Sequence, residues 1–214
     1  SGLMVGRVYL LTEGDGLTLI DTSIASAGKK ILAQLQENGF SAGDIKRILI
    51  THAHPDHVGS VHELVQATGA QQVVPDGEKS VYEGEIPIPS GEGWLQPPQT
   101  TLENLKADQT LKDGDVLSDV MGGLHVIATP GHTMGHSAYW QPERKILFCG
   151  DTIFNAPRTR LPLRAPTVNM AENIRSIAKL EPLKPDVICF GHGKPITENA
   201  AQRLTAFAKK VGAI

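Results

Sequence analysis

Short apolar runs that each lead into a polar side chain recur five times along this chain of 214 residues. The runs are rich in Ile, Val and Phe and are bounded by Gly, Thr or Pro, which favours buried strands over helices. Five strand ends are therefore predicted to carry side chains that can bind a metal. The runs and the polar residues that follow them are 17–20 with Asp21, 47–50 with Thr51 and His52, 126–129 with His132, 146–149 with Asp151, and 187–190 with His192.

Segments with the 3.6-residue spacing of half-buried helices lie between these runs. Additional strands are predicted where short turns, such as 13–16, join apolar stretches. The mixture indicates sheets covered by helices, an α/β (α+β) fold without the strict alternation of a (β/α) barrel. The predicted helices span 26–38, 58–68, 171–180 and 199–211, and the additional strands span 8–11, 124–128 and 137–140.

The length of the chain favours a single domain over residues 1–214. Within it, residues 76–108 are rich in Pro, Gly, Ser and Gln, and we expect a lid or insertion loop there. Tyr82 or Trp94 in this segment is a candidate for an apolar wall beside a substrate. The alternative is that these aromatic residues pack the loop onto its own domain or onto a second subunit, which would give a homodimer.

The formal net charge of −3 leaves no general basic footprint, so we expect no nucleic-acid partner. No apolar stretch approaches the roughly 20 residues that a membrane span needs, so we also expect no membrane partner. Cys149 and Cys189 each lie inside an apolar run and are expected to be inert core thiols. Unpaired thiols fit a reducing compartment, and we expect a cytoplasmic protein.

The run at 52–57 reads His-Ala-His-Pro-Asp-His and places four potential ligands within six residues. Side chains two residues apart project to the same side of extended backbone, so His52 and His54 can bind one cation together. Asp56 and His57 follow the turn at Pro55 and can face a second cation, about 3.5 to 4 Å from the first in two-metal hydrolases. The weaker alternative is a solvated His-rich loop.

Imidazole and carboxylate ligands together suit Zn, Fe or Mn, and the absence of clustered Cys argues against a structural zinc module. Two other histidines are expected to lie outside such a site. His62 on a predicted helix should be exposed, and His125 on a predicted strand should be packed.

These motifs together resemble the metallo-β-lactamase superfamily, in the branch shared by glyoxalase II and quorum-quenching lactonases. The resemblance implies a four-layer αββα sandwich, with two mixed sheets flanked by helices. It spans most of the chain, from residue 17 to residue 193. The motifs that carry it are 51–57 (THAHPDH), 129–136 (TPGHTMGH), 150–152 (GDT) and 191–193 (GHG), with Asp21 after the early strand.

The resemblance implies a dinuclear centre in which each of two divalent ions has three ligands and one carboxylate is shared. Zinc is favoured, with iron or manganese as alternatives. Asp21 and His136 match positions that support such a site without binding metal. The implied ligands are His52, His54 and His132 for the first ion, Asp56, His57 and His192 for the second, and Asp151 as the bridge.

A water held by two such ions has its pKa lowered from about 15.7 towards 7, which makes hydroxide available at neutral pH. This hydroxide would attack the carbonyl carbon of a small-molecule ester, thioester or lactone while one ion polarises the carbonyl oxygen. Asp56 is a candidate to shuttle the proton as well as to bind metal. The sequence therefore predicts a metal-dependent hydrolase.

Departures from individual relatives limit the choice of substrate. True β-lactamases usually carry Cys or a non-ligand at the position of Asp151, so β-lactam hydrolysis would be at most incidental. Lactonases often carry Tyr at the position of Phe154, and glyoxalase II enzymes continue with a Cys-Gly-Arg segment that is absent here. Arg158, Arg160 and Arg164 are expected either to bind an anionic substrate group or to be solvated. The alternative functions are a mononuclear iron oxygenase of the persulfide dioxygenase type and a non-catalytic metal-binding scaffold.

Overall fold

Two five-stranded sheets lie face to face in the computed structural model, which describes residues 5–13, 16–93 and 99–214. In the first sheet the strand order is β1-β2-β3-β4-β5; β1 and β2 are antiparallel, and the other neighbours are parallel. The carboxyl ends of β2 to β5 therefore lie at one edge of this sheet. The strands are β1 (Tyr9–Glu13), β2 (Gly16–Ile20), β3 (Ile45–Leu49), β4 (Gln71–Pro75) and β5 (Gln109–Leu111).

The second sheet is also mixed, with the strand order β12-β9-β8-β7-β6. β12 and β9 are parallel, and the remaining neighbours are antiparallel. A separate two-stranded ribbon joins β10 (Phe154–Asn155) to β11 (Thr159–Arg160). The strands of the second sheet are β6 (Val116–Leu117), β7 (Leu124–Ala128), β8 (Ser137–Gln141), β9 (Ile146–Phe148) and β12 (Val187–Cys189).

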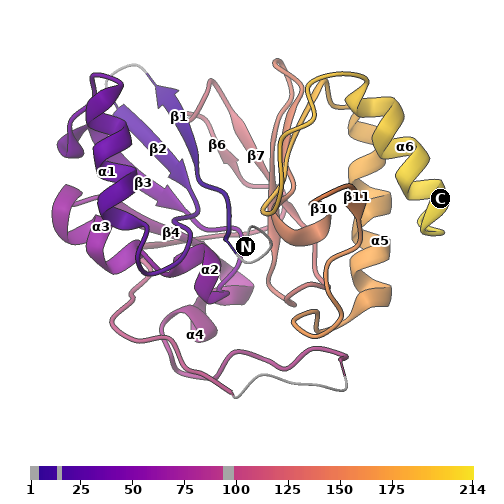
Figure 1. The fold of residues 1–214 in the computed structure, drawn as a ribbon, viewed down its shortest axis with the longest axis horizontal. Helices are drawn as coiled ribbons and strands as arrows, with labels where there is room; N and C mark the ends of the chain where they lie inside the picture. The colour runs from indigo at the N-terminus through magenta and orange to yellow at the C-terminus, as the bar shows by residue number, and fades with distance from the viewer. Residues whose placement is uncertain (1–4, 14–15, 94–98) are drawn as a thin grey trace.

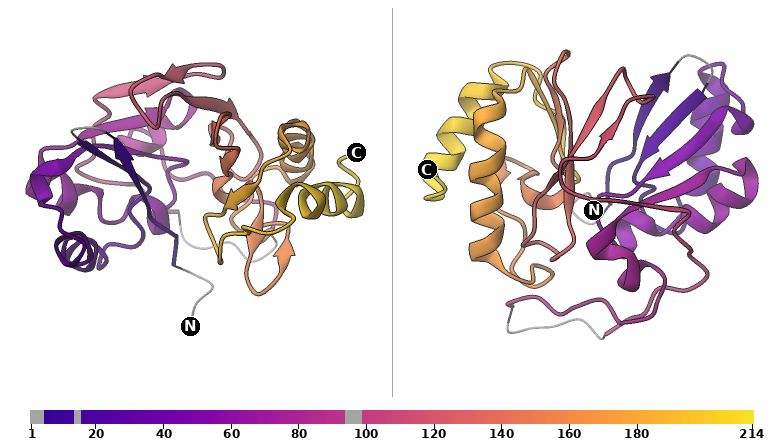
Figure 2. Two further views of the ribbon diagram at one scale, coloured as in Figure 1. Left: turned by 90° about the horizontal axis from the view of Figure 1, so that it is seen from above. Right: turned by 180° about the vertical axis from the view of Figure 1, so that it is seen from behind.

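Helices cover the outer face of each sheet, as two views from opposite sides show (Figures 1 and 2). On the first sheet these are α1 (Gly28–Glu37) and α3 (Val61–Thr68), and on the second α5 (Met170–Leu180) and α6 (Ala200–Lys210). The four layers confirm the predicted αββα sandwich with two mixed sheets. Shorter pieces are the helices α2 (Pro55–Val58) and α4 (Lys79–Tyr82) and the 3-10 turns Ala42–Asp44, Asp76–Glu78, Gly150–Thr152 and Glu181–Leu183.

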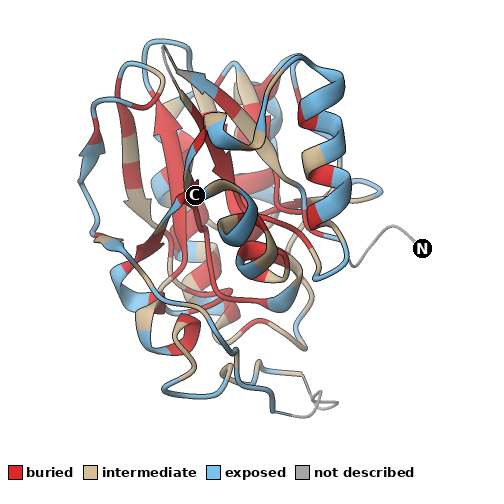
Figure 3. Cartoon of the chain, turned by 90° about the vertical axis from the view of Figure 1, so that its left-hand side faces the viewer, coloured by how far each residue is buried: buried red, intermediate tan, exposed pale blue. Residues whose placement is uncertain are grey.

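Side chains on adjacent strand positions enter different layers of the core, because successive residues of a strand point to opposite faces. On β2, Leu19 packs under the helices of the first half, whereas Ile20 packs between the two sheets. On β8, Trp140 faces the helices of the second half and Tyr139 faces the opposite sheet. Buried residues accordingly follow the strands in the interior (Figure 3). Burial on both faces explains why the strands appear in the sequence as nearly continuous apolar runs.

The helix predicted at 58–68 is confirmed as α3 from Val61 onward, but its predicted start is wrong, because residue 58 ends the separate helix α2. The loop after β2 approaches the break closely: the Gly59 amide donates to the Ser23 carbonyl at 2.9 Å, and the Ser60 hydroxyl donates to the Ile24 carbonyl at 2.6 Å. A Cβ on Gly59 would lie 2.4 Å from the Ala25 nitrogen. A tertiary contact therefore ends the helix where the periodicity alone continues it.

The segment 76–108 is more ordered at its start than the sequence suggests, because residues 76–82 form a 3-10 turn and helix α4. Tyr82 is fully buried there, and its hydroxyl donates to Gln72 Oε1 at 2.9 Å. The candidate wall role for Tyr82 is therefore wrong, and the alternative of packing onto its own chain is confirmed. Trp94, the other candidate, lies outside the described residues.

Two expectations about the chain as a whole can be compared with the structure. In the described ranges, each helix is too short or too polar to cross a membrane. Cys149 and Cys189 are both buried and form no disulfide, as the interpretation of inert core thiols requires.

We predict that the hydroxyl of Tyr139 ties the two sheets together. It is fully buried and donates to the carbonyl of Ile50, just beyond β3, at 2.6 Å. The substitution Tyr139→Phe leaves that carbonyl without this donor and should lower the free energy of unfolding by about 1–3 kcal/mol. Tyr82→Phe is the control, because the half-exposed Gln72 can turn to water, and it should cost less in urea denaturation. An equal or smaller loss for Tyr139→Phe would contradict the prediction.

Candidate metal centre

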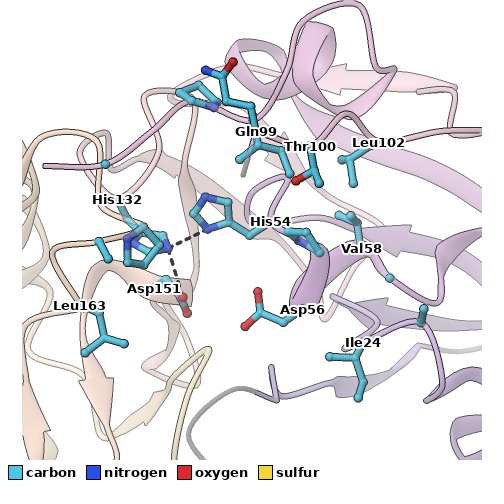
Figure 4. Close-up of a pocket in the computed structure, with 18 of the residues that line it drawn as sticks. Ile24, His54, Asp56, Val58, Gln99, Thr100, Leu102, His132, Asp151 and Leu163 are labelled. Carbon is cyan, nitrogen blue, oxygen red and sulfur yellow. Dashed lines mark hydrogen bonds and ion pairs between the residues drawn. The ribbon is translucent and has the colours of Figure 1, made fainter. Parts of the chain in front are cut away.

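Polar side chains from both halves of the molecule meet between the two sheets, where strands β2, β3, β7, β9 and β12 end. The run at 52–57 follows β3 and continues into α2. Figure 4 shows His54 and Asp56 from one half pointing toward His132 and Asp151 from the other. The structure thus brings together side chains that are far apart in sequence.

The first group consists of three imidazoles and one carboxylate. His54 Nδ1 lies 3.1 Å from His52 Nε2 and 3.0 Å from His132 Nε2. Asp151 Oδ2 lies 3.3 Å from His132 Nε2 and 3.9 Å from His52 Nε2. Ligands bound at 2.0–2.2 Å in a tetrahedral zinc site are about 3.3–3.6 Å apart. The donor atoms of this group therefore converge as ligands of one ion would.

The second group shares Asp151 with the first. His192 Nε2 lies 3.2 Å from Asp151 Oδ2 and 3.2 Å from Asp56 Oδ2. His57 Nε2 lies 3.4 Å from both Asp151 Oδ1 and His192 Nε2. Asp151 Oδ1 is buried and accepts no hydrogen bond from the part of the chain that the structure describes. A buried carboxylate oxygen without a donor fits a cation, so the residues present suit a divalent metal.

Asp21, predicted to support the site, contacts His57 directly and is connected to His52 through Thr51. Its Oδ2 lies 2.7 Å from His57 Nδ1 and accepts the Thr51 hydroxyl at 2.8 Å, while Oδ1 accepts the Thr51 amide at 2.8 Å. The same hydroxyl lies 3.0 Å from His52 Nδ1. This network assigns the protons to the outer nitrogens of His52 and His57. The inner nitrogens of both rings are then free to bind metal.

His136 contacts the backbone of Asp151 and no other member of the two groups by hydrogen bond among the described residues. Its Nε2 accepts the Asp151 amide at 3.0 Å, and its Nδ1 donates to the Thr129 hydroxyl at 2.7 Å. Burial lowers the pKa of His136 to about 3, so the ring stays neutral in this role. The geometry fits the supporting role that was expected.

Glu78 is a functional candidate that the sequence did not indicate. It is buried, and its carboxylate accepts the Ala53 amide at 2.8 Å, the Thr133 hydroxyl at 2.5 Å and the Gly135 amide at 3.0 Å. It therefore connects the loop of His52 and His54 to the loop of His132. A Cβ on Gly135 would lie 2.2 Å from the carbonyl carbon of Gly77, so the backbones of the two segments are in contact. Glu78 lies in an aperiodic segment, which left no signal for this contact.

The two groups differ in their electrostatics. Burial lowers the pKa of His52 well below its usual value and that of His54 to about 3. Burial acts in the same direction on His57 and His192, but their carboxylate neighbours outweigh it, and the pKa of His192 rises to about 9. Burial raises the pKa of Asp151, but the surrounding imidazoles outweigh it and hold that pKa well below the usual range. The buried carboxylates thus favour positive charge at this place, and a bound cation would supply it.

A cleft of about 650 Å³ opens above these groups. Asp56 is the most exposed of the seven side chains, with 27% of its side chain accessible, and it lines the cleft beside His54, His132, Asp151 and His192. Apolar side chains form most of the remaining wall (Figure 4). They are Ile24, Ala25, Pro55, Val58, Ile88, Pro89, Leu102, Leu105, Phe154, Leu163, Ala165 and Pro166.

Residues 88–93 and 99–105 form the roof of this cleft, and we refer to them as the roof segment. Glu92 attaches it to the loop before α5: its amide donates to the Thr167 carbonyl at 2.8 Å, and its carboxylate accepts the Met170 amide at 2.9 Å and pairs with Arg164 at 3.1 Å. The Thr167 hydroxyl lies 3.0 Å from His132 Nδ1. The attachment of the roof thus involves the residue that holds His132.

The other residues that the sequence singled out lie partly in the cleft and partly outside it. Phe154 lines the cleft, with its ring centroid 4.5 Å from that of His192. Arg158 and Arg164 are exposed and Arg160 is half-buried on β11, and none of the three lines the cleft. His62 is exposed, as predicted, and it lines the cleft. His125 is half-buried on β7.

The comparisons with known proteins agree with one another on one family. The family model described as the metallo-beta-lactamase superfamily matches residues 1–192. A hydroxyacylglutathione hydrolase of Rhodospirillum rubrum is 33% identical over 174 residues, which cover 81% of this chain and 56% of that protein. The chain spans about half the length of the hydroxyacylglutathione hydrolases that it matches. The probable metallo-hydrolase YybB of Bacillus subtilis is 28% identical over 195 residues, 90% of this chain and 83% of that protein.

Solved structures agree with this relationship. The metallo-beta-lactamase family protein TTHA1429 from Thermus thermophilus superposes with a TM-score of 0.74 at 25% identity, covering 97% of this chain and 75% of that one. TTHA1623, solved in a di-iron-bound form, has a TM-score of 0.72 at 30% identity and covers 97% of each chain. With the αββα sandwich and the converging His and Asp side chains, these matches show that the chain belongs to the metallo-β-lactamase superfamily.

Proposed function

We propose that this protein is a hydrolase that uses two divalent metal ions to cleave an ester, thioester or lactone bond of a small molecule. The observation that carries the proposal is the position of Asp151, whose two oxygens lie at the junction of two groups of converging donors. When bound, two such ions would acidify a water and polarise a carbonyl oxygen. Zinc suits the donor set, and the di-iron form of TTHA1623 makes iron the first alternative.

The chain's own residues have separate tasks in this proposal. His52, His54 and His132 would hold one ion, Asp56, His57 and His192 the other, and Asp151 both. Asp56 is the proposed proton carrier as well as a ligand, because its half-exposed carboxylate faces the cleft while Asp151 is buried. It would accept a proton from the attacking water and deliver it to the leaving group.

The alternatives from the sequence receive less support. An oxygenase with one iron needs only one group of donors, so the second group, Asp56 with His57 and His192, would bind no metal. The name of the Rhodospirillum rubrum relative supports a thioester as one substrate class. The β-lactamases among the solved structures are under 25% identical and support only the similarity of the fold.

Three further expectations stay predictions: the single domain, the homodimer and the role of residues 76–108 as a lid.

We predict that the purified protein, loaded with zinc, binds about two ions per chain and hydrolyses a simple thioester. Asp151→Asn removes the charge that both groups share and should lower the metal content to one ion or less, together with a loss of kcat of at least about 100-fold. Asp186→Asn, near β12 and remote from the cleft lining, is the matched control and should keep both ions. Elemental analysis with thioester assays measures both effects. One ion in the wild type, with oxygen consumption, would favour the oxygenase; two ions without turnover would favour the scaffold.

Glu78 should support the metal site although it does not bind metal. Glu78→Gln keeps the shape but cannot accept all three hydrogen bonds from Ala53, Thr133 and Gly135, which should loosen both ligand loops. We expect metal affinity to fall by about 10- to 100-fold, the range typical of residues that orient ligands. Competition with a chelator measures this affinity. Glu83→Gln, which alters an ion pair with Lys79 and a hydrogen bond from the Ala107 amide, should have no such effect, and equal affinities in the two variants would count against the role.

The attachment of the roof segment at Glu92 should affect substrate binding. Glu92→Ala removes the contacts with Met170 and Arg164. We expect KM to rise by up to about tenfold, which corresponds to the free energy of one charged hydrogen bond, and kcat to change less. Glu172→Ala removes a comparable surface pair with Arg175 on α5 and is the control. Steady-state kinetics with limited proteolysis of the roof segment would test this. An unchanged KM and an unchanged cleavage rate would argue against a roof function.

A further inference from the structure

The cleft combines a large apolar wall with very little charge away from the proposed metal ligands. Its described lining contains no Lys or Arg, and its only carboxylate besides Asp56 and Asp151 is that of Glu103. Polar side chains without a carboxylate, such as Gln99 and Thr100, also line it. A volume of about 650 Å³ is in the range of sites that enclose small organic molecules.

The arginines closest in sequence to the bridging carboxylate do not supply the missing positive charge. Arg164 pairs with Glu92 at 3.1 Å on the outside of the roof attachment, and Arg160 donates to the Leu161 carbonyl at 3.3 Å. A substrate carboxylate held against the apolar walls, away from the proposed metal ions, would therefore lose water without gaining a cationic side chain as a partner, which is unfavourable. Glu103 would add repulsion of like charge.

The apolar residues surround the cleft on three sides. Figure 4 shows Ile24 and Val58 on one side, Leu163 on the opposite side and Leu102 in the roof, with Asp56 and Asp151 between them. An extended apolar group that starts at the metal end would contact all three sides. Burial of such a group is favourable in proportion to its area.

We infer that the cleft binds a medium-length apolar group of an uncharged ester or thioester and discriminates against substrates that carry carboxylates beside the scissile bond, such as glutathione thioesters. The inference rests on the proposed hydrolase function and narrows its substrate class. It separates this chain from the hydroxyacylglutathione hydrolases, whose name specifies a glutathione conjugate.

The direct test uses the zinc-loaded protein with pairs of thioesters that share one acyl group and differ in the thiol, glutathione or the uncharged N-acetylcysteamine. With N-acetylcysteamine, kcat/KM should rise by up to about fourfold for each methylene from acetyl to octanoyl, as expected for buried methylenes. For a given acyl group, the glutathione thioester should react at least about tenfold more slowly in kcat/KM. A rate independent of chain length, or a preference for glutathione, would overturn the inference.

A charge placed in the cleft should change this preference. Leu163→Lys puts a cation beside the apolar walls and should raise the ratio of kcat/KM for glutathione over N-acetylcysteamine thioesters by about tenfold. Val116→Lys adds the same charge at an exposed position on β6, outside the cleft lining, and should leave the ratio as in the wild type. The same shift in both variants, or no shift in Leu163→Lys, would contradict the role of the cleft.

Binding measurements separate this inference from the proposed function. Calorimetry with amide analogues, in which the scissile sulfur is replaced by nitrogen, needs no turnover. The uncharged octanoyl amide should bind at least about tenfold more tightly than the glutathione amide, and the reverse order would overturn the inference. If these affinities have the expected order but no thioester is cleaved, the proposed hydrolase function fails and the inferred ligand class stands.

Discussion

The buried carboxylate of Asp151 is the group around which the two halves of the molecule are arranged. It is 3% exposed and lies within 3.4 Å of ring nitrogens of His57, His132 and His192. Those rings come from the loop after β3 in one half and from the loops after β7 and β12 in the other. A buried carboxylate without a cationic partner is strongly unfavourable, so its surroundings must supply positive charge, through protons on imidazoles or through metal. The strand ends of both sheets are thereby drawn to one place.

Hydrogen bonds hold these groups in position from outside the cluster. Asp21 fixes His57 directly and His52 through Thr51, while His136 holds the backbone of Asp151. Glu78 joins two ligand loops, and Thr167 connects His132 to the loop on which the roof segment rests. The supporting residues therefore extend from the first sheet to the roof. The roof of the cleft and the converging His and Asp side chains are linked through a few buried hydrogen bonds, which is how a site on loops acquires a defined geometry.

Local patterns in the sequence predict sheets covered by helices and the candidate ligands at strand ends, whereas the four layers and the grouping of the seven side chains came from the resemblance to a family. Apolar runs that end in Asp21 and His52 identify the ends of the parallel strands β2 and β3 at one edge of the first sheet, and the run before Asp151 identifies the end of β9 in the second sheet. The sequence does not predict the break between α2 and α3, because Gly59 meets a loop from another part of the chain. Nor does it indicate Glu78, whose partners are 25 to 57 residues away. The lining of the cleft was likewise unpredictable, since it depends on which side chains of many separate segments, from residue 24 to residue 192, face one another.

The central claim is that two ions share Asp151. Anomalous diffraction from a crystal of the zinc-loaded protein measures this directly. Two peaks are expected, about 3.5–4 Å apart, one among His52, His54 and His132 and the other among Asp56, His57 and His192, with the Asp151 carboxylate between them. A single peak, or a second peak outside these residues, would contradict the account.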